Sequence, residues 1–304
     1  MLSGVWNENE TSFSNYSTAA YDKAPLFDRL TEDGFQLNLY EDGLVWQSEK
    51  KSIVDNLEPC EAKMEDKDTS FMWRKWVLFK YLPSSLKPSS AIENFDLNPN
   101  CSTGSGTIFS EDNKTLYNLF DANDLQLTKD NIFHFIHAEG AHIPFNYDKN
   151  LNKIEDGTYE QKLASSITLL KVWLQRLKDF GVYDNSVIIV LSDHGYNEEN
   201  YKNSSSYNHY GRQNPALLIK GINEHHSVMK NSTLPISFID LNQAYEELLN
   251  NKKATELFSG IPLDRKRRYF YYDFLDDAHM IEYEQTGKAW ENETMVPTGK
   301  EYNL

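Results

Sequence analysis

The sequence predicts an α/β fold with a mostly parallel central sheet and a small antiparallel subdomain at its C-terminal end. Residues 187–191 are all apolar, and residues 132–137 form a second, mostly apolar run, so both predict strands buried on two faces. Between them, residues 158–181 carry the strongest helical pattern in the chain. A strand, a helix and a strand in this order predict a right-handed crossover that makes the two strands parallel neighbours.

The predicted crossover helix has clear signals at both ends. Thr158 and Gln161 have the spacing of a capping box, and Gly181 is a typical residue just past a helix end. Its apolar residues recur at three and four positions and are Leu163, Ile167, Leu170, Trp173, Leu174 and Leu177. The crossover places the loops after both strands at one sheet edge, where α/β folds carry their ligand sites.

The other expected elements are shorter. Pro25 opens a helix that stops at Gly34, and Phe35–Tyr40 alternates as a strand does. Residues 71–82 predict an apolar helix that is too short to span a bilayer. It either packs in the core or faces lipid at a membrane surface. Further strands are expected at 44–46, 216–220, 269–272 and 280–283. A further helix is expected at 116–127, and the segment 235–249 leads into another. We expect an α/β domain over 1–260, on which the antiparallel strands of 261–304 pack.

Composition excludes some classes of partner. The formal net charge of −16 argues against binding to nucleic acid, because that affinity comes from clustered cations. The sequence contains no apolar run long enough for a membrane span, and Met1–Gly4 lacks the parts of a signal peptide. Cys60 and Cys101 either form one disulfide or are unrelated thiols.

The most informative polar residues follow the strand of residues 187–191. Asp193 and His194 come just past it, and a carboxylate beside an imidazole on a rigid strand end can bind one divalent metal ion. Gly195 then allows the backbone to turn away. The alternative is that Asp193 caps the next turn and His194 is an ordinary loop histidine.

The strand of residues 132–137 also delivers polar residues at its carboxyl end. His142 is the candidate for contact with an anionic group, because an imidazole stabilises an anion as a donor or as a cation. Glu139 is either a ligand or a loop acid. His134 and His137 alternate with apolar residues and predict sheet histidines whose hydrogen bonds are satisfied.

The region around Asp193 resembles the metal site of the sulfatases and of the phosphoethanolamine or lipoteichoic-acid transferases, in the alkaline phosphatase superfamily. The resemblance is carried by Tyr183-Asp184-Asn185-Ser186, by Ser192-Asp193-His194-Gly195, and by His209-Tyr210-Gly211-Arg212 with Asn214-Pro215 before the next strand. The Gly140-Ala141-His142-Ile143-Pro144-Phe145 segment is similar to the family segment whose histidine contacts the substrate's phosphate or sulfate.

This resemblance implies a three-layer α/β/α sandwich and a role for each motif residue. Asp193 and His194 would be metal ligands, and His209 would bind a second metal ion or the transferred group. His142 and His209 would act in catalysis and in substrate binding. Arg212 would clamp the anion with two hydrogen bonds, or would form a structural salt bridge instead.

The resemblance extends to the first residues. Met1-Leu2-Ser3-Gly4 resembles the end of the segment that follows the family's nucleophile, so we expect the chain to begin just after that nucleophile and to lack the first metal-binding Asp. The hydroxyls near this place are Ser3, Thr11, Ser12 and Thr18, and none has the family's sequence context.

The resemblance thus implies an incomplete catalytic domain of a metal-dependent hydrolase or transferase, which acts on sulfate or phosphate esters such as a lipid or glycan headgroup. The alternative is an inactive domain that binds an anion or a partner. One carboxylate with imidazoles suits Mn²⁺ or Zn²⁺ better than Ca²⁺, and Mg²⁺ also occurs at such sites. An extracytoplasmic location, as part of a membrane-anchored parent, follows from the family analogy alone.

Overall fold

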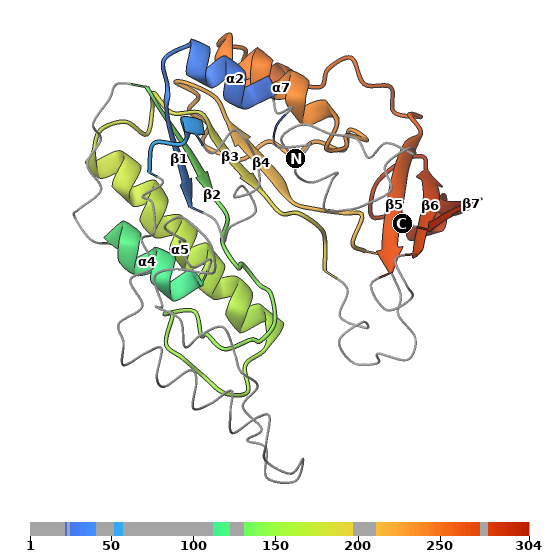
Figure 1. The fold of residues 1–304 in the computed structure, drawn as a ribbon, viewed down its shortest axis with the longest axis horizontal. Helices are drawn as coiled ribbons and strands as arrows, with labels where there is room; N and C mark the ends of the chain where they lie inside the picture. Colours follow the sequence, from blue (N-terminus) through green and yellow to red (C-terminus); the bar gives the residue numbers. More distant parts are fainter. Residues whose placement is uncertain are drawn as a thin grey trace. The chain divides into compact units, whose positions relative to one another are not determined.

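The computed structural model describes residues 22, 25–40, 52–56, 112–121, 131–196, 211–273 and 279–303. The chain divides into two compact units, Phe27–Arg176 and Met1–Leu26 with Leu177–Leu304. In the described residues the fold is mixed α/β, with short sheets (Figure 1). The expected division into 1–260 and 261–304 stays a prediction, and the elements expected at 44–46 and 71–82 lie outside the described residues.

The unit Phe27–Arg176 is built on one parallel strand pair. β1 (Gln36–Tyr40) pairs with β2 (Ile132–Ile136) in parallel, with Leu37 opposite Phe133 and Tyr40 opposite Ile136. α2 (Pro25–Glu32) precedes β1, and Gly34 takes a φ of 77° where the chain leaves the helix, as the sequence predicts.

Helices contact both faces of this strand pair. On one face, the ring of Phe27 from α2 meets the ring of Phe133 edge-on, with centroids 6.2 Å apart. On the other face, Tyr40 packs with α4 (Asn113–Asp121) and α5 (Tyr159–Asp179), which lie alongside each other in Figure 1. The buried residues of this core are Tyr40, Leu116, Phe120 and Leu169. Because both faces are covered, β1 is buried along nearly its whole length.

The long helix α5 forms with the predicted cap. Thr158 N–H donates to Gln161 Oε1 (2.9 Å), and Gln161 N–H donates to Thr158 Oγ1 (3.3 Å), which completes the capping box. In the first half of the helix, the residues of the apolar pattern are not the ones that are buried. Leu163 and Ile167 are 39% and 44% exposed, whereas Lys162 and Ser165 are fully buried. Polar contacts to the loop after β2, described below, draw that polar face inward.

The other unit contains an antiparallel strand pair that packs against a helix. β3 (Ile188–Leu191) pairs with β4 (Leu217–Lys220) in antiparallel register, and α7 (Asp240–Leu249) packs on this pair through Ala244 and Leu248. β2 pairs with β1 and β3 with β4, so the described ladders do not contain the predicted pairing of β2 with β3, and parallel pairing does not predominate in them.

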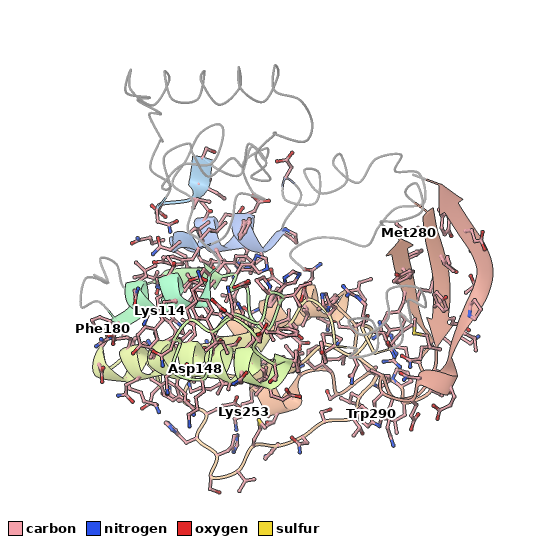
Figure 2. All side chains as sticks on the ribbon, turned by 90° about the horizontal axis from the view of Figure 1, so that it is seen from below. Lys114, Asp148, Phe180, Lys253, Met280 and Trp290 are labelled. Atoms are coloured by element: carbon pink, nitrogen blue, oxygen red, sulfur yellow. The ribbon has the colours of Figure 1, made fainter. Side chains whose placement is uncertain are left out.

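The C-terminal strands form the predicted antiparallel sheet. β5 (Arg267–Asp273), β6 (His279–Gln285) and β7 (Met295–Asn303) lie in the order β5-β6-β7. Short 3₁₀ helices occur at η5 (Ala254–Glu256) and η6 (Asn292–Thr294). Trp290, labelled in Figure 2, lies in the connection between β6 and β7, and its side chain is 53% exposed.

Candidate metal centre

Asp193 and His194 lie directly past the carboxyl end of β3, as predicted, on backbone that is tied to the segment before β4. Ser192 N–H donates to the Ala216 carbonyl (3.1 Å), and Ala216 N–H donates back to Ser192 Oγ (2.8 Å). Further on, Gly195 N–H donates to the Arg212 carbonyl (2.9 Å). The two residues therefore sit between hydrogen bonds on either side, which limits how far their backbone can move.

The His194 ring has a defined orientation. Its Nδ1 lies 2.8 Å from the Gly195 carbonyl oxygen, and because a carbonyl only accepts, the neutral ring carries its proton on Nδ1. The lone pair of Nε2 is then available to a ligand, and Nε2 lies 3.6 Å from Asp193 Oδ2. Two ligands of one tetrahedral ion, each bound at about 2.1 Å, lie about 3.4 Å apart. The spacing of the pair and the Nδ1–H tautomer are compatible with ligation of one metal ion.

Gly195 has a structural role that the sequence does not indicate. It is closely approached by backbone, and a Cβ built there would lie 2.1 Å from the Gly211 carbonyl oxygen and 2.7 Å from that of Asn214. Gly195 is needed for this contact with the 211–214 turn, because no larger residue leaves room for the two carbonyls. The sequence predicts a glycine at which the chain turns, and the structure adds a close packing contact with the 211–214 turn.

The second half of the motif is described from Gly211 onward, and His209 lies outside the described residues. The backbone carbonyl of Arg212 accepts the hydrogen bond of Gly195 N–H. Its guanidinium has no ion-pair partner among the described residues. Gln213, which the sequence does not single out, is 8% exposed and holds the turn through its side chain. A lone Gln in a loop carries no signal that would have identified it.

His142 belongs to the other unit, Phe27–Arg176, so its convergence with Asp193 and His194 stays a prediction. Its side chain is exposed, and its Nδ1 lies 2.5 Å from the Ile143 carbonyl oxygen. Its backbone N–H donates to the Glu139 carbonyl (3.2 Å). By the same argument as for His194, a neutral His142 ring presents Nε2 as the acceptor.

The loop that carries His142 is fixed by buried polar side chains from α4 and α5. Asn113, which is fully buried, donates from Nδ2 to the Gly140 carbonyl (2.8 Å) and accepts from Gly140 N–H (3.1 Å). Lys162 Nζ, also fully buried, contacts Glu139 Oε2 at 2.6 Å and Asn146 Oδ1 at 2.7 Å. Hydrogen bonds therefore anchor the loop both before and after His142. Glu139 is the ion-pair partner of a buried lysine.

Two groups near β2 have pKa values that their surroundings shift. Burial lowers the pKa of His134 to about 4, and neither of its ring nitrogens has a hydrogen-bond partner, so the prediction of a satisfied sheet histidine is wrong for it. Burial and a hydrogen bond to Asp112 raise the pKa of Tyr147 to about 12. His137 uses its backbone N–H to extend the β1–β2 ladder to the Tyr40 carbonyl (2.8 Å).

The described residues bring together two side-chain donors rather than a full metal shell. No group of three or more His, Cys, Asp or Glu residues in this part of the chain is placed to hold a metal ion. Asp193 and His194 form the pair, with the backbone of Arg212 behind it. Among the described helices, none combines the length and the apolar character that a membrane crossing requires.

No protein-family model matches the chain, and a search of curated proteins finds no match either.

Proposed function

We propose that the chain carries part of the metal site of a hydrolase or transferase that acts on sulfate or phosphate esters. The observation that carries the proposal is the Asp193–His194 pair, with Nε2 and Oδ2 3.6 Å apart and the Nδ1 proton engaged by the Gly195 carbonyl. A backbone carbonyl on the second ring nitrogen is the usual way that a metal-binding histidine is oriented. The motif resemblance supplies the reaction class, and with it a three-layer α/β/α fold.

The donor set determines which ions suit the site. A carboxylate and an imidazole are ligands for Zn²⁺ and Mn²⁺, whereas Mg²⁺ and Ca²⁺ favour shells made of oxygen. We therefore expect Mn²⁺ or Zn²⁺ to bind more tightly than Ca²⁺. When bound, the ion would stabilise negative charge on the oxygens of the transferred group.

The protein's own residues would share the remaining work. Asp193 and His194 hold the ion, and His209 binds a second ion or the transferred group. The Arg212 guanidinium would donate hydrogen bonds to the anion, and the exposed His142 would donate from Nε2 as the imidazolium, because its Nδ1 faces the Ile143 carbonyl. A phosphate- or sulfate-bearing lipid or glycan headgroup, met outside the cytoplasm, is the substrate class that the family resemblance favours.

The test begins with metal binding by the purified chain. Mn²⁺ is titrated and the free ion is measured by electron paramagnetic resonance, with Zn²⁺ added as a competitor. We expect one site, which Asp193→Asn and His194→Ala each weaken by about 10-fold or more. A matched control exists on the same unit, because His225 Nδ1 lies 3.8 Å from Asp184 Oδ1 in an exposed pair. His225→Ala should leave Mn²⁺ binding unchanged.

Turnover separates the enzyme from a binding domain. Aryl phosphate and aryl sulfate are assayed with each metal ion, and activity that His194→Ala abolishes supports the hydrolase or transferase. Metal and phosphate binding without turnover favours the alternative, an inactive domain that binds an anion. A chain that binds Mn²⁺ and Zn²⁺ no better than the His194→Ala variant does would refute the metal site.

A further inference from the structure

Gln213 is a buried amide whose hydrogen bonds join two separate segments. Its Oε1 accepts from Gly211 N–H (2.7 Å), and its Nε2 donates to the Ala289 carbonyl (3.0 Å) and to Asn292 Oδ1 (2.9 Å). Both Nε2 protons and one lone pair of Oε1 are therefore used. The side chain is 8% exposed. It forms one hydrogen bond within the 211–213 turn and two that link this turn to the connection between β6 and β7.

The turn that Gln213 holds is the one against which the metal motif packs. The Gly211 carbonyl oxygen lies so close to Gly195 that a Cβ there would be 2.1 Å from it, and the Arg212 carbonyl accepts from Gly195 N–H (2.9 Å). The next group along the chain, the Gly195 carbonyl, is the one that engages His194 Nδ1 (2.8 Å). An uninterrupted path of contacts thus leads from Gln213 to the His194 ring.

We propose that Gln213 is a positioning residue for the metal site, which sets the orientation and tautomer of His194 through Gly195. The inference rests on the proposed function as far as the metal is concerned, but the orientation of the His194 ring is a property of the metal-free chain. Partners behind a ligand histidine typically change metal affinity by about 10- to 100-fold.

A general loss of stability is the competing explanation, and Gln285 provides the control for it. Gln285 is fully buried, and its Nε2 donates to the Lys288, Ala289 and Glu291 carbonyls (3.3 Å each). It shares the Ala289 acceptor with Gln213, yet it has no hydrogen bond to the 211–214 turn in the described structure. Gln285→Met should therefore destabilise the chain without moving His194.

The experiment uses the full chain and two measurements. The first is the tautomer of the His194 ring in the metal-free protein, read from two-bond ¹H–¹⁵N NMR correlations and assigned by their loss in His194→Ala. The wild type should show the Nδ1–H form. Gln213→Met should give a mixture of tautomers, whereas Gln285→Met should keep the wild-type pattern.

The second measurement is the affinity for Mn²⁺. We expect a loss of about 10- to 100-fold in Gln213→Met and less than about 3-fold in Gln285→Met. Asn292→Ala, which removes one exposed acceptor of Gln213, should give a smaller loss in the same direction, and it decides the question if Gln213→Met does not fold.

The outcomes separate the two proposals. If the wild type binds no Mn²⁺, the proposed function fails, and the tautomer comparison alone decides the role of Gln213. A folded Gln213→Met variant with the wild-type tautomer overturns the inference. So does a Gln285→Met variant that shifts the tautomer and weakens Mn²⁺ binding as much as Gln213→Met does.

Discussion

Acidification should destabilise the unit Phe27–Arg176 through His134. The ring lies between Tyr40, at a centroid distance of 5.9 Å, and Trp173, at 5.2 Å, and both of its nitrogens are buried without a hydrogen-bond partner. No carboxylate is among these neighbours. Burial therefore lowers the pKa of His134 from 6.5 to about 4, because the imidazolium would lose its hydration without gaining a partner.

The sign and size of the effect follow from proton linkage. Between pH 6.5 and 4 the unfolded chain binds a proton at this residue and the folded chain does not, so stability falls as the pH falls. Each pH unit of difference between the two pKa values is worth about 1.4 kcal/mol. The loss reaches about 3 kcal/mol at pH 4, and about 1.5 kcal/mol of it occurs between pH 6.5 and 5.

The assay compares wild type with His134→Phe, which keeps a ring between Tyr40 and Trp173 but does not titrate. Urea denaturation, followed by circular dichroism at pH 7.0, 6.5, 6.0, 5.5 and 5.0, gives the free energy of unfolding of each protein. Other groups titrate equally in both proteins, so the difference isolates His134. His142→Gln, an exposed histidine of the same unit, is the control and should behave like the wild type.

The wild type should lose about 1.5 kcal/mol more than His134→Phe between pH 6.5 and 5. Parallel curves for the two proteins would refute the reasoning. They would mean that His134 is hydrated, or that it has found a partner, in the folded chain. An NMR titration that places the pKa of His134 near 6.5 would refute it as well.

Other predictions concern stability and the metal motif. Lys162→Met leaves Glu139 without its partner and should cost about 3 kcal/mol in urea denaturation, and adding Glu139→Gln should recover part of that loss. Thr158→Ala removes one half of the α5 capping box and should cost about 1 kcal/mol, measured in the same way. Gly195→Ala forces a Cβ against the Gly211 carbonyl, and we expect a loss of about 3 kcal/mol together with weaker Mn²⁺ binding. Wild-type stability in any of these variants would contradict the contact that it removes or adds.

Local sequence signals located the described elements well. The helix that stops at Gly34, the capping box of Thr158 and Gln161, and the strands that end before Asp193 and near His137 were all predicted. These features depend on neighbours within a few residues, such as a cap, a glycine with positive φ, or a run of apolar side chains. Their physical causes are therefore visible in the sequence.

The direction in which the strands pair could not be predicted from these local signals. Residues 188–191 read as a strand buried on both faces, and such a run looks the same whether its partner is parallel or antiparallel. The antiparallel return to Leu217–Lys220 is decided by backbone hydrogen bonds between segments some 25 residues apart. Periodicity within one strand carries no information about those bonds.

Most of the described helices and strands, and the Asp193–His194 pair as a candidate for sharing an ion, can be located from the sequence. The buried face of α5 depends instead on long-range contacts, because Lys162 and Ser165 turn inward to partners on distant segments. The support that Gly195 and Gln213 give to the motif also depends on long-range contacts, since close approach and amide hydrogen bonding depend on which segments meet. The chemistry of a side chain limits the kinds of contact that it can make, but the fold determines which residue it contacts.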